Sequence, residues 1–271
     1  MRYILNDLEK IKKNLAGKYL FLFLDCDGTL AHIVDTPDKA VISPETKRLL
    51  NSLAENKNYK VAIISGRALA DIKEKVGLKN IIYSGNHGFQ IEGPKVKHEM
   101  AVPLNYKNVL RRIKIQLEDK LSGIKGVFVE DKKLSLALHF RLADKRQIPF
   151  IKTVFHESVI LYLVRNKIKI SPGKKILEIM PPVHWNKGKI VLWLLARQEA
   201  LSKNGKIVPI YIGDDLTDED AFKVLKNRGL TIFVGSTNSS HAKYYVKDVK
   251  GVYVFLKWIL NNQGEKQICQ N

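Results

Sequence analysis

Short apolar runs in the first and last thirds of the chain predict strands that are buried on both faces. The runs are YLFLFL (19–24), VAII (61–64), IIY (81–83), VPIYI (208–212) and TIFV (231–234), and each ends in a polar or glycine-containing segment. Helical patterns lie between them, as in SPETKRLLNSLAEN, where Ser43 is placed as N-cap and Pro44 in the first turn. The alternation predicts an α/β fold with a parallel sheet.

The middle of the chain follows another pattern, which predicts a helix, two strands, a helix and two strands. The expected elements are a helix over 106–122, a hairpin within 126–141, a helix over roughly 144–163, and a hairpin within 167–181 that turns at Pro172-Gly173. Pro103 precedes this segment and Pro181-Pro182 follows it. We therefore expect an α+β domain over 104–179, inserted into a core made of 1–103 and 180–271.

Length and composition predict a folded protein of ordinary globular type. With 271 residues, of which 45% are hydrophobic, the chain can bury a substantial core. No run approaches the roughly 18 apolar residues of a membrane span, and the first 15 residues, MRYILNDLEKIKKNL, have the pattern of an amphipathic helix and not of a signal peptide. We expect a cytoplasmic protein without membrane contacts. Cys26 and Cys269 have no spacing for a disulfide framework or a metal site.

The net charge of +19 is concentrated in the middle of the chain, where residues 104–178 hold 17 Lys and Arg against 7 Asp and Glu. Such a charge fits nucleic acid, an anionic membrane surface or a small anionic substrate, and composition does not choose among them. A high lysine content with few Met and Cys residues also fits adaptation to heat, which would make the charge irrelevant to partners.

Polar residues follow each predicted strand of the core, at the sheet edge where ligands of parallel sheets bind. They are Asp25 and Asp27 in DCDGTL, Ser65 and Arg67 in SGR, Asn86 and His87 in SGNHG, and Asp214, Asp215 and Asp218 in GDDLTDED. Each motif alone has an ordinary explanation, such as a solvated turn or a helix cap. Together they predict converging carboxylates that need a cation, and oxygen ligands without a His or Cys set favour Mg²⁺.

These motifs, with Lys187 of NKGK, resemble in order and position the four motifs of the haloacid dehalogenase-like phosphohydrolases. The resemblance implies a Rossmann-like core with an α+β cap. Within that superfamily, YSGNHGFQIEG, LALHFR, GKKILEIMP and GDDLTDEDAF are similar to the trehalose-6-phosphate phosphatases. One departure is Asn186 directly before Lys187, where that family more often has an acid, although Asn is also a good N-cap.

The resemblance implies a role for each motif residue. Asp25 would be the nucleophile that forms an aspartyl-phosphate, Asp27 the acid and base, and Ser65 and Lys187 the phosphoryl-binding groups. The presence of Asp27 argues against dehalogenation, because a halide leaving group needs no proton. The implied metal site uses Asp25, Asp27, Asp214 and Asp215, with Asp218 as a further ligand or an orienting group, and Asp215 ranks above Asp218. The implied substrate-binding residues are Arg67, Asn86, His87, Glu130, Lys132, Arg141, Lys174 and Glu178.

The activity implied is Mg²⁺-dependent hydrolysis of trehalose 6-phosphate, and a trehalose-6-phosphate synthase is a possible pathway partner. Two alternatives stay open. One is a phosphatase of the same fold for another sugar phosphate, such as sucrose 6-phosphate or mannosyl-phosphoglycerate. The other, motivated by the net charge, is a nucleic-acid-binding protein with a vestigial site, although the interleaved aromatic and basic residues of an RNA-binding sheet are missing.

Overall fold

The computed structural model describes residues 1–173, 175–201, 206–236 and 239–262. The chain divides into two compact units, Met1–His98 with Trp185–Asn271, called here the core unit, and Glu99–His184, called the inserted unit. The inserted unit extends a few residues beyond the expected range of 104–179 at each end. Lys174, one of the predicted substrate-binding residues, lies outside the described residues.

Strands of the core unit form one sheet, which has nine strands among the described residues and the order β1-β13-β12-β11-β2-β3-β4-β5-β6. Their bounds are β1 Arg2–Tyr3, β2 Tyr19–Leu24, β3 Tyr59–Ile64, β4 Ile82–Gly85, β5 Gln90–Gly93, β6 Val96–Glu99, β11 Ile207–Gly213, β12 Leu230–Val234 and β13 Tyr244–Val246. The pairs from β1 through β4 are parallel, and β5 is antiparallel to β4. All five strands predicted from apolar runs are confirmed.

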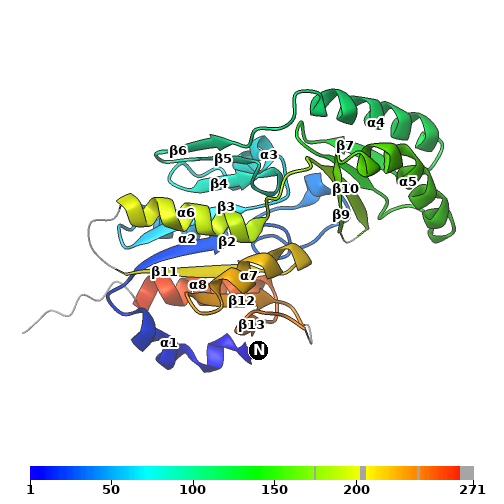
Figure 1. Cartoon of the computed structure of the whole chain (residues 1–271). Coiled ribbons are helices and arrows are strands. Elements are labelled where there is room, and N and C mark those ends of the chain that lie inside the picture. The colour runs from blue at the N-terminus through cyan, green and yellow to red at the C-terminus, as the bar shows by residue number, and fades with distance from the viewer. Residues whose placement is uncertain (174, 202–205, 237–238, 263–271) are drawn as a thin grey trace, which may run out of the picture. The chain divides into compact units, whose positions relative to one another are not determined.

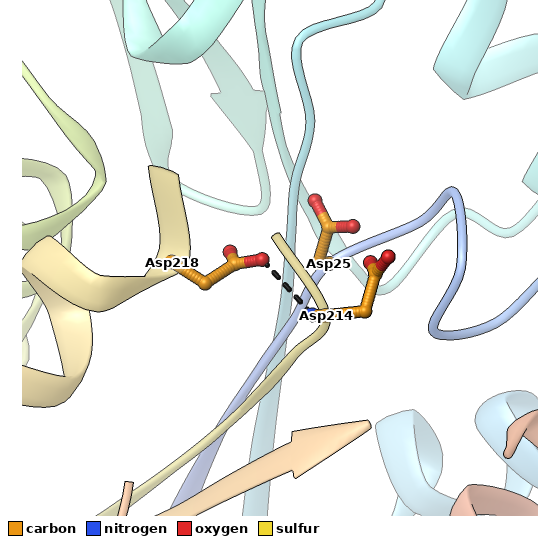
Figure 2. Close-up of side chains that lie close together, drawn as sticks. All are labelled: Asp25, Asp214 and Asp218. Atoms are coloured by element: carbon orange, nitrogen blue, oxygen red, sulfur yellow. Dashed lines mark hydrogen bonds between the residues drawn. The ribbon is translucent and has the colours of Figure 1, made fainter. Parts of the chain in front are cut away.

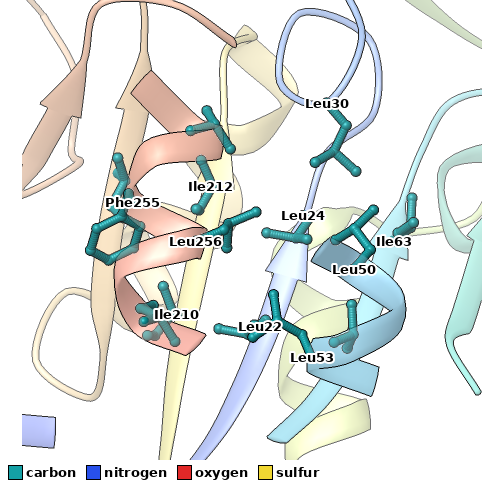
Figure 3. Close-up of a cluster of buried hydrophobic side chains, with 14 of the residues drawn as sticks. Leu22, Leu24, Leu30, Leu50, Leu53, Ile63, Ile210, Ile212, Phe255 and Leu256 are labelled. Carbon is teal, nitrogen blue, oxygen red and sulfur yellow. The ribbon is translucent and has the colours of Figure 1, made fainter. Parts of the chain in front are cut away.

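Helices cover both faces of this sheet (Figure 1). They are α1 Leu8–Leu15, α2 Pro44–Glu55, α3 Leu69–Val76, α6 Lys187–Leu201, α7 Glu219–Leu225 and α8 Val249–Asn262. The predicted N-cap of α2 is confirmed, since the Ser43 hydroxyl accepts a hydrogen bond from the Thr46 amide at 3.1 Å. Leu22 and Leu24 of β2 pack with α2 and α8 on one face (Figure 3), whereas the α6 and α7 side packs against Phe21 and Phe23.

The inserted unit is a four-stranded antiparallel sheet with two helices. Its elements are α4 Tyr106–Leu121, β7 Phe128–Asp131, β8 Leu136–His139, α5 Ile148–Val164, β9 Lys169–Gly173 and β10 Ile176–Met180, and the strand order is β7-β8-β10-β9. Leu136, Leu138, Leu177 and Ile179 project from the sheet into the same apolar cluster as the helices. This face therefore holds the unit together.

One turn prediction in the inserted unit was wrong. Pro172 and Gly173 do not form the hairpin turn but end β9, where they pair with Leu177 and Ile176. The turn lies between Gly173 and Ile176 and includes Lys175, whose φ is 66°. Because β9 is an edge strand, the missing N–H of a proline is tolerated there.

Over the described part of the chain, no helix is both long enough and apolar enough to cross a lipid bilayer.

Candidate active site

The catalytic candidates of the core unit lie where its central parallel strands end. Asp25 follows β2 and Asp214 follows β11, the strand beside it, and the Asp25 amide donates to the Ile212 carbonyl at 2.9 Å. The turn after Asp25 depends on Gly28, which has φ 89°. A side chain at Gly28 would collide with the Asp214 carboxylate, so the turn packs directly against it.

Three buried carboxylates converge at this edge, those of Asp25, Asp214 and Asp218 (Figure 2). Each offers one oxygen, and these oxygens lie within 4.8 Å of one another. The Lys187 ammonium lies among them and donates to Asp25 at 2.6 Å and to Asp218 at 2.7 Å. Lys187 is the first residue of α6, and Asn186 caps that helix by accepting from the Lys189 amide at 2.9 Å, as the sequence predicts.

The cluster holds three acids and one lysine, a surplus of negative charge in a buried place. Burial raises the pKa of Asp25 well above its ordinary value, Lys187 opposes this, and Asp218 and Asp214 add to it. Burial acts to lower the pKa of Lys187, but Asp218 and Asp25 outweigh it and the pKa is raised. Lys187 is therefore charged at neutral pH, and a divalent cation would balance the remaining charge.

Asp218 differs from the other two carboxylates because strong donors occupy both of its oxygens. Oδ1 accepts from Lys187 at 2.7 Å and from the Tyr211 hydroxyl at 2.6 Å, and Oδ2 accepts from the amides of Asp214 at 3.1 Å and Asp215 at 2.9 Å. Burial, followed by the charge of Asp218, raises the pKa of Tyr211, so its phenol stays a donor. These bonds fit a residue that orients Lys187 and the metal-binding loop.

A metal ion fits the chemistry of this cluster. Buried carboxylate oxygens at short mutual distances, without a His or Cys partner in the described cluster, are the donors that hard divalent cations prefer. The structure brings together Asp25, Asp214 and Asp218, the last of which the sequence left open as a ligand or an orienting group. Asp215 turns toward the start of a 3₁₀ helix, Leu216–Asp218, where its carboxylate accepts from the Leu216 amide at 2.6 Å in a capping box.

Asp27 lies apart from the carboxylate cluster and pairs with Arg67. The guanidinium donates to both oxygens of Asp27, each at 2.6 Å. It also donates to Asp71 at 2.7 Å and to the Pro37 carbonyl at 2.9 Å. Burial acts to lower the pKa of Arg67, and the bonds to Asp27 and Asp71 more than offset it. Arg67 is thus a rigid clamp on Asp27, and sequence reasoning missed its Asp71 partner.

Ser65, Asn86 and His87 occupy the ends of the next two strands. Ser65 is buried after β3, where its hydroxyl accepts from the Arg67 amide at 3.1 Å. Asn86 and His87 begin a 3₁₀ turn after β4 and both have positive φ, 50° and 54°. The Asn86 amide donates to the Arg67 carbonyl at 2.7 Å, and the His87 amide donates to the Ser65 carbonyl at 3.1 Å. The two loops therefore fix each other.

The predicted sugar-binding residues of the inserted unit gather on the sheet face away from its helices. Glu130 of β7 and Glu178 of β10 both pair in register with Ala137 of β8, so they form one row across three strands, called here the acid row. Glu178 accepts from Lys132 at 2.8 Å and from the Ser135 hydroxyl at 3.2 Å.

His139 and Phe128 also lie beside the acid row of the inserted unit. Glu130 contacts the His139 ring at 2.7 Å, and although burial acts to raise the pKa of Glu130, the bond to His139 lowers it overall. The ring of Phe128 stacks on His139 with centroids 4.4 Å apart. Arg141 follows β8 and is partly exposed. The structure thus brings Glu130, Lys132 and Glu178 together in the inserted unit.

Comparison with known proteins gives matches that cover most of this chain. The family model described as trehalose-phosphatase matches residues 23–250. Trehalose-phosphate phosphatase B of Arabidopsis thaliana is 34% identical over 278 residues, covering 97% of this chain and 73% of the relative. A trehalose-phosphate phosphatase of Mycobacterium bovis is 35% identical over 230 residues, covering 83% of this chain and 56% of the relative. The solved C-terminal domain of a C. albicans trehalose-6-phosphate phosphatase superposes with a TM-score of 0.77 at 26% identity, covering 94% of this chain and 95% of that one.

Proposed function

This chain belongs to the trehalose-phosphatase family, and we propose on that premise that it hydrolyses trehalose 6-phosphate to trehalose and phosphate. The observation that carries the proposal is the extent of the family match, residues 23–250. That range includes the whole carboxylate cluster and the acid row. The core unit would then be the phosphatase core, and the inserted unit the part that selects the sugar.

Asp25 is the nucleophile of this proposal. One of its oxygens attacks phosphorus, the bond from phosphorus to the sugar oxygen breaks, and the phosphoryl group stays on Asp25 as an acyl phosphate. Water then attacks that phosphorus and releases inorganic phosphate, which restores the carboxylate. Asp25 is suited to this role because its backbone is fixed by the Ile212 carbonyl and its side chain by Lys187.

Asp27 is the proton donor to the departing sugar oxygen and the base that later takes a proton from water. Arg67 supports this role as a positioning residue, because its double bond to Asp27 fixes the direction of the carboxylate. The clamp must loosen for Asp27 to carry a proton. Arg67 is therefore assigned to Asp27, in place of the direct substrate contact expected from the sequence.

Positive charge and donors around the phosphoryl group stabilise its transfer. Lys187 and Ser65 would bind phosphoryl oxygens, with Asn86 and His87 holding the neighbouring loop. Mg²⁺ is the proposed cofactor, and Asp25 and Asp214 are the residues that would hold it. When bound, it supplies positive charge that offsets the carboxylates and the phosphate. Asp218 keeps Lys187 and the amides of the metal-binding loop in place.

Sugar recognition is proposed for the inserted unit. Glu130 and Glu178 are acceptors suited to hydroxyl groups, and Lys132 and Arg141 are donors for hydroxyl or phosphate oxygens. We propose Lys174 as a further donor of this kind, on the basis of its position in the sequence alone. We further propose that the enzyme acts in the cytoplasm on the product of a trehalose-6-phosphate synthase.

A phosphate-release screen tests the function. The purified protein is given trehalose 6-phosphate, sucrose 6-phosphate, glucose 6-phosphate and p-nitrophenyl phosphate, with Mg²⁺ or with excess chelator. We expect trehalose 6-phosphate to have the highest kcat/KM, and activity to disappear in chelator and return with Mg²⁺ but not with Ca²⁺, whose larger and looser coordination would misplace Asp25.

Asp25→Asn is the matched control in this screen, since it keeps the size of the side chain and removes the nucleophile. It should abolish release from every substrate while the circular dichroism spectrum is unchanged. A higher kcat/KM for another sugar phosphate would contradict the trehalose assignment, and full activity in chelator would contradict the cofactor.

A further inference from the structure

A second concave site lies in the core unit, away from the carboxylate cluster. It is a cavity of about 320 Å³, a size at which small-molecule sites begin. Its described lining comes from β2, β3, β4, the turn between β5 and β6, the start of β6, and the last turns of α6.

The cavity lies near the ends of these elements that are opposite to the catalytic residues. Lys60 is the second residue of β3 and Ser65 follows the last, so the two are separated by roughly 16 Å along the strand. Lys187 begins α6 and Arg197 lies ten residues later, roughly 15 Å along the helix axis. No member of the carboxylate cluster lines the cavity. It is therefore a separate site.

Three cations line this cavity, Lys60, Lys95 and Arg197, and none of its described lining residues is acidic. Arg197 is oriented by a bond from its guanidinium to the Lys95 carbonyl at 2.6 Å. Lys95 has φ 61°, at a turn position that usually takes Gly or Asn. Burial, together with the charge of Lys95, lowers the pKa of Lys60. Lys60 is partly buried, whereas Lys95 and Arg197 are exposed at the cavity.

The wall below these cations is apolar. Pro94 and Leu201 line the cavity and keep exposed surface, whereas Phe21, Ile82 and Leu194 are almost completely buried in the cluster between the sheet and α6. A polyanion such as nucleic acid would not enter a space of this size. A small molecule with one dianionic group and a compact apolar or ring portion satisfies both parts, the cations and the wall.

We propose that this cavity is a binding site for a small organic phosphate or phosphonate, independent of the proposed phosphatase activity. The dianionic group contacts Lys60, Lys95 and Arg197, and the organic part lies against Pro94 and Leu201.

Isothermal titration with phenylphosphonate, which cannot be hydrolysed as a phosphate ester, tests the proposal on the full chain. The titration is done in excess chelator, because the metal-free catalytic cluster has three acids against one lysine and repels a dianion. We expect one binding event in the native protein. Lys60→Gln with Arg197→Gln should weaken it at least tenfold, whereas Lys10→Gln with Lys13→Gln, the same charge change on exposed residues of α1, should alter the affinity less than twofold.

Several results would overturn the proposal. They are an absence of binding in the native protein, an unchanged affinity in the Lys60 and Arg197 variant, or equal weakening in both pairs of variants, which would indicate bulk charge alone. Methylphosphonate distinguishes an organic ligand from simple phosphate, and we expect it to bind at least tenfold more weakly than phenylphosphonate. Equal affinity for the two would refute the role of the apolar wall. Circular dichroism of each variant checks that it folds.

Discussion

Lys187 of the core unit and Lys132 of the inserted unit are both buried lysines, but they face different numbers of carboxylates. Lys187 bonds to Asp25 and Asp218 and lies in a cluster that includes Asp214, so three carboxyl groups face one ammonium group. Lys132 bonds to Glu178, which also accepts from the Ser135 hydroxyl, and Glu130 of the same acid row is paired with His139. The first cluster has a charge surplus and the second pair is balanced.

The difference shows how buried charge indicates the kind of ligand. A buried negative surplus is unfavourable without a cation, which fits the metal and phosphoryl chemistry proposed for the core unit. A balanced pair needs no ion and can exchange hydrogen bonds with neutral hydroxyls, which fits the sugar proposed for the inserted unit. The cavity lined by Lys60, Lys95 and Arg197 differs in sign and in burial, because only Lys60 is partly buried and no described lining residue is acidic, and this positive surplus fits an anion.

The comparison is tested most strongly by removing Lys187. Lys187→Met leaves three buried acids without their lysine, so we expect the free energy of unfolding in chelator to fall by about 3–5 kcal/mol. Turnover should be lost as well. Mg²⁺ should restore part of the stability, since it replaces the missing positive charge. Calorimetry with chelator and then with Mg²⁺ measures both effects.

Lys189→Met is the matched control for Lys187→Met, because it removes an exposed lysine from the same turn of α6. It should leave the melting temperature nearly unchanged. If Lys187→Met melts at the native temperature in chelator, the negative surplus is not a real feature of the folded protein.

The balanced pair is tested by neutralising Glu178. Glu178→Gln removes a charged acceptor from the acid row, and we expect kcat/KM for trehalose 6-phosphate to fall about 100-fold, equivalent to roughly 3 kcal/mol of transition-state binding. With p-nitrophenyl phosphate, which has no sugar, kcat/KM should change less than about threefold, because binding energy from the sugar is absent for that substrate.

Glu157→Gln, an exposed residue of α5, is the control for this change and should affect neither substrate. Equal losses with both substrates would make Glu178 a structural or catalytic residue. An unchanged trehalose 6-phosphate activity would move sugar recognition away from the acid row.

Much of this fold could be predicted because its central strands are continuous apolar runs, as in residues 19–24. The short strands β1, β5, β6 and β13 were missed, since two to four residues carry little periodicity. The ends of neighbouring parallel strands predict that Asp25 and Asp214 lie close together, and the carboxylate cluster contains both. The sequence ranks Asp215 above Asp218, but a capping box turns Asp215 away and four hydrogen bonds hold Asp218 at the cluster.

Other features depend on tertiary contacts that no linear pattern contains. The hydroxyl of Tyr211 lies inside an apolar strand, and only the fold brings it to Asp218. Arg67 follows the expected motif, but its two aspartate partners are 40 and 4 residues away in the chain. Lys60, Lys95 and Arg197 likewise belong to separate segments, so the positive surplus of the cavity cannot be read from spacing.

The smallest expected effect concerns that positive surplus, and it is a gain in stability. Burial and Lys95 lower the pKa of Lys60 in the folded protein, so the unfolded chain binds this proton more tightly. The charged lysine therefore destabilises the fold at neutral pH, and the penalty fades as pH rises through the lowered pKa toward the ordinary lysine value of about 10.4. Lys60→Gln should raise the melting temperature by about 1–3 °C at neutral pH, and by less near pH 10.

Ligand binding should reverse the order of the two melting temperatures, so that the native protein melts above the Lys60→Gln variant. Saturating phenylphosphonate stabilises the native protein by mass action and leaves the Lys60→Gln variant with little gain, because the variant binds it weakly. Thermal melts at neutral pH, with and without the phosphonate, measure the reversal. A variant that melts below the native protein in the absence of phosphonate would show that Lys60 stabilises the fold by itself, and the cavity would then have no charge surplus for an anion to relieve.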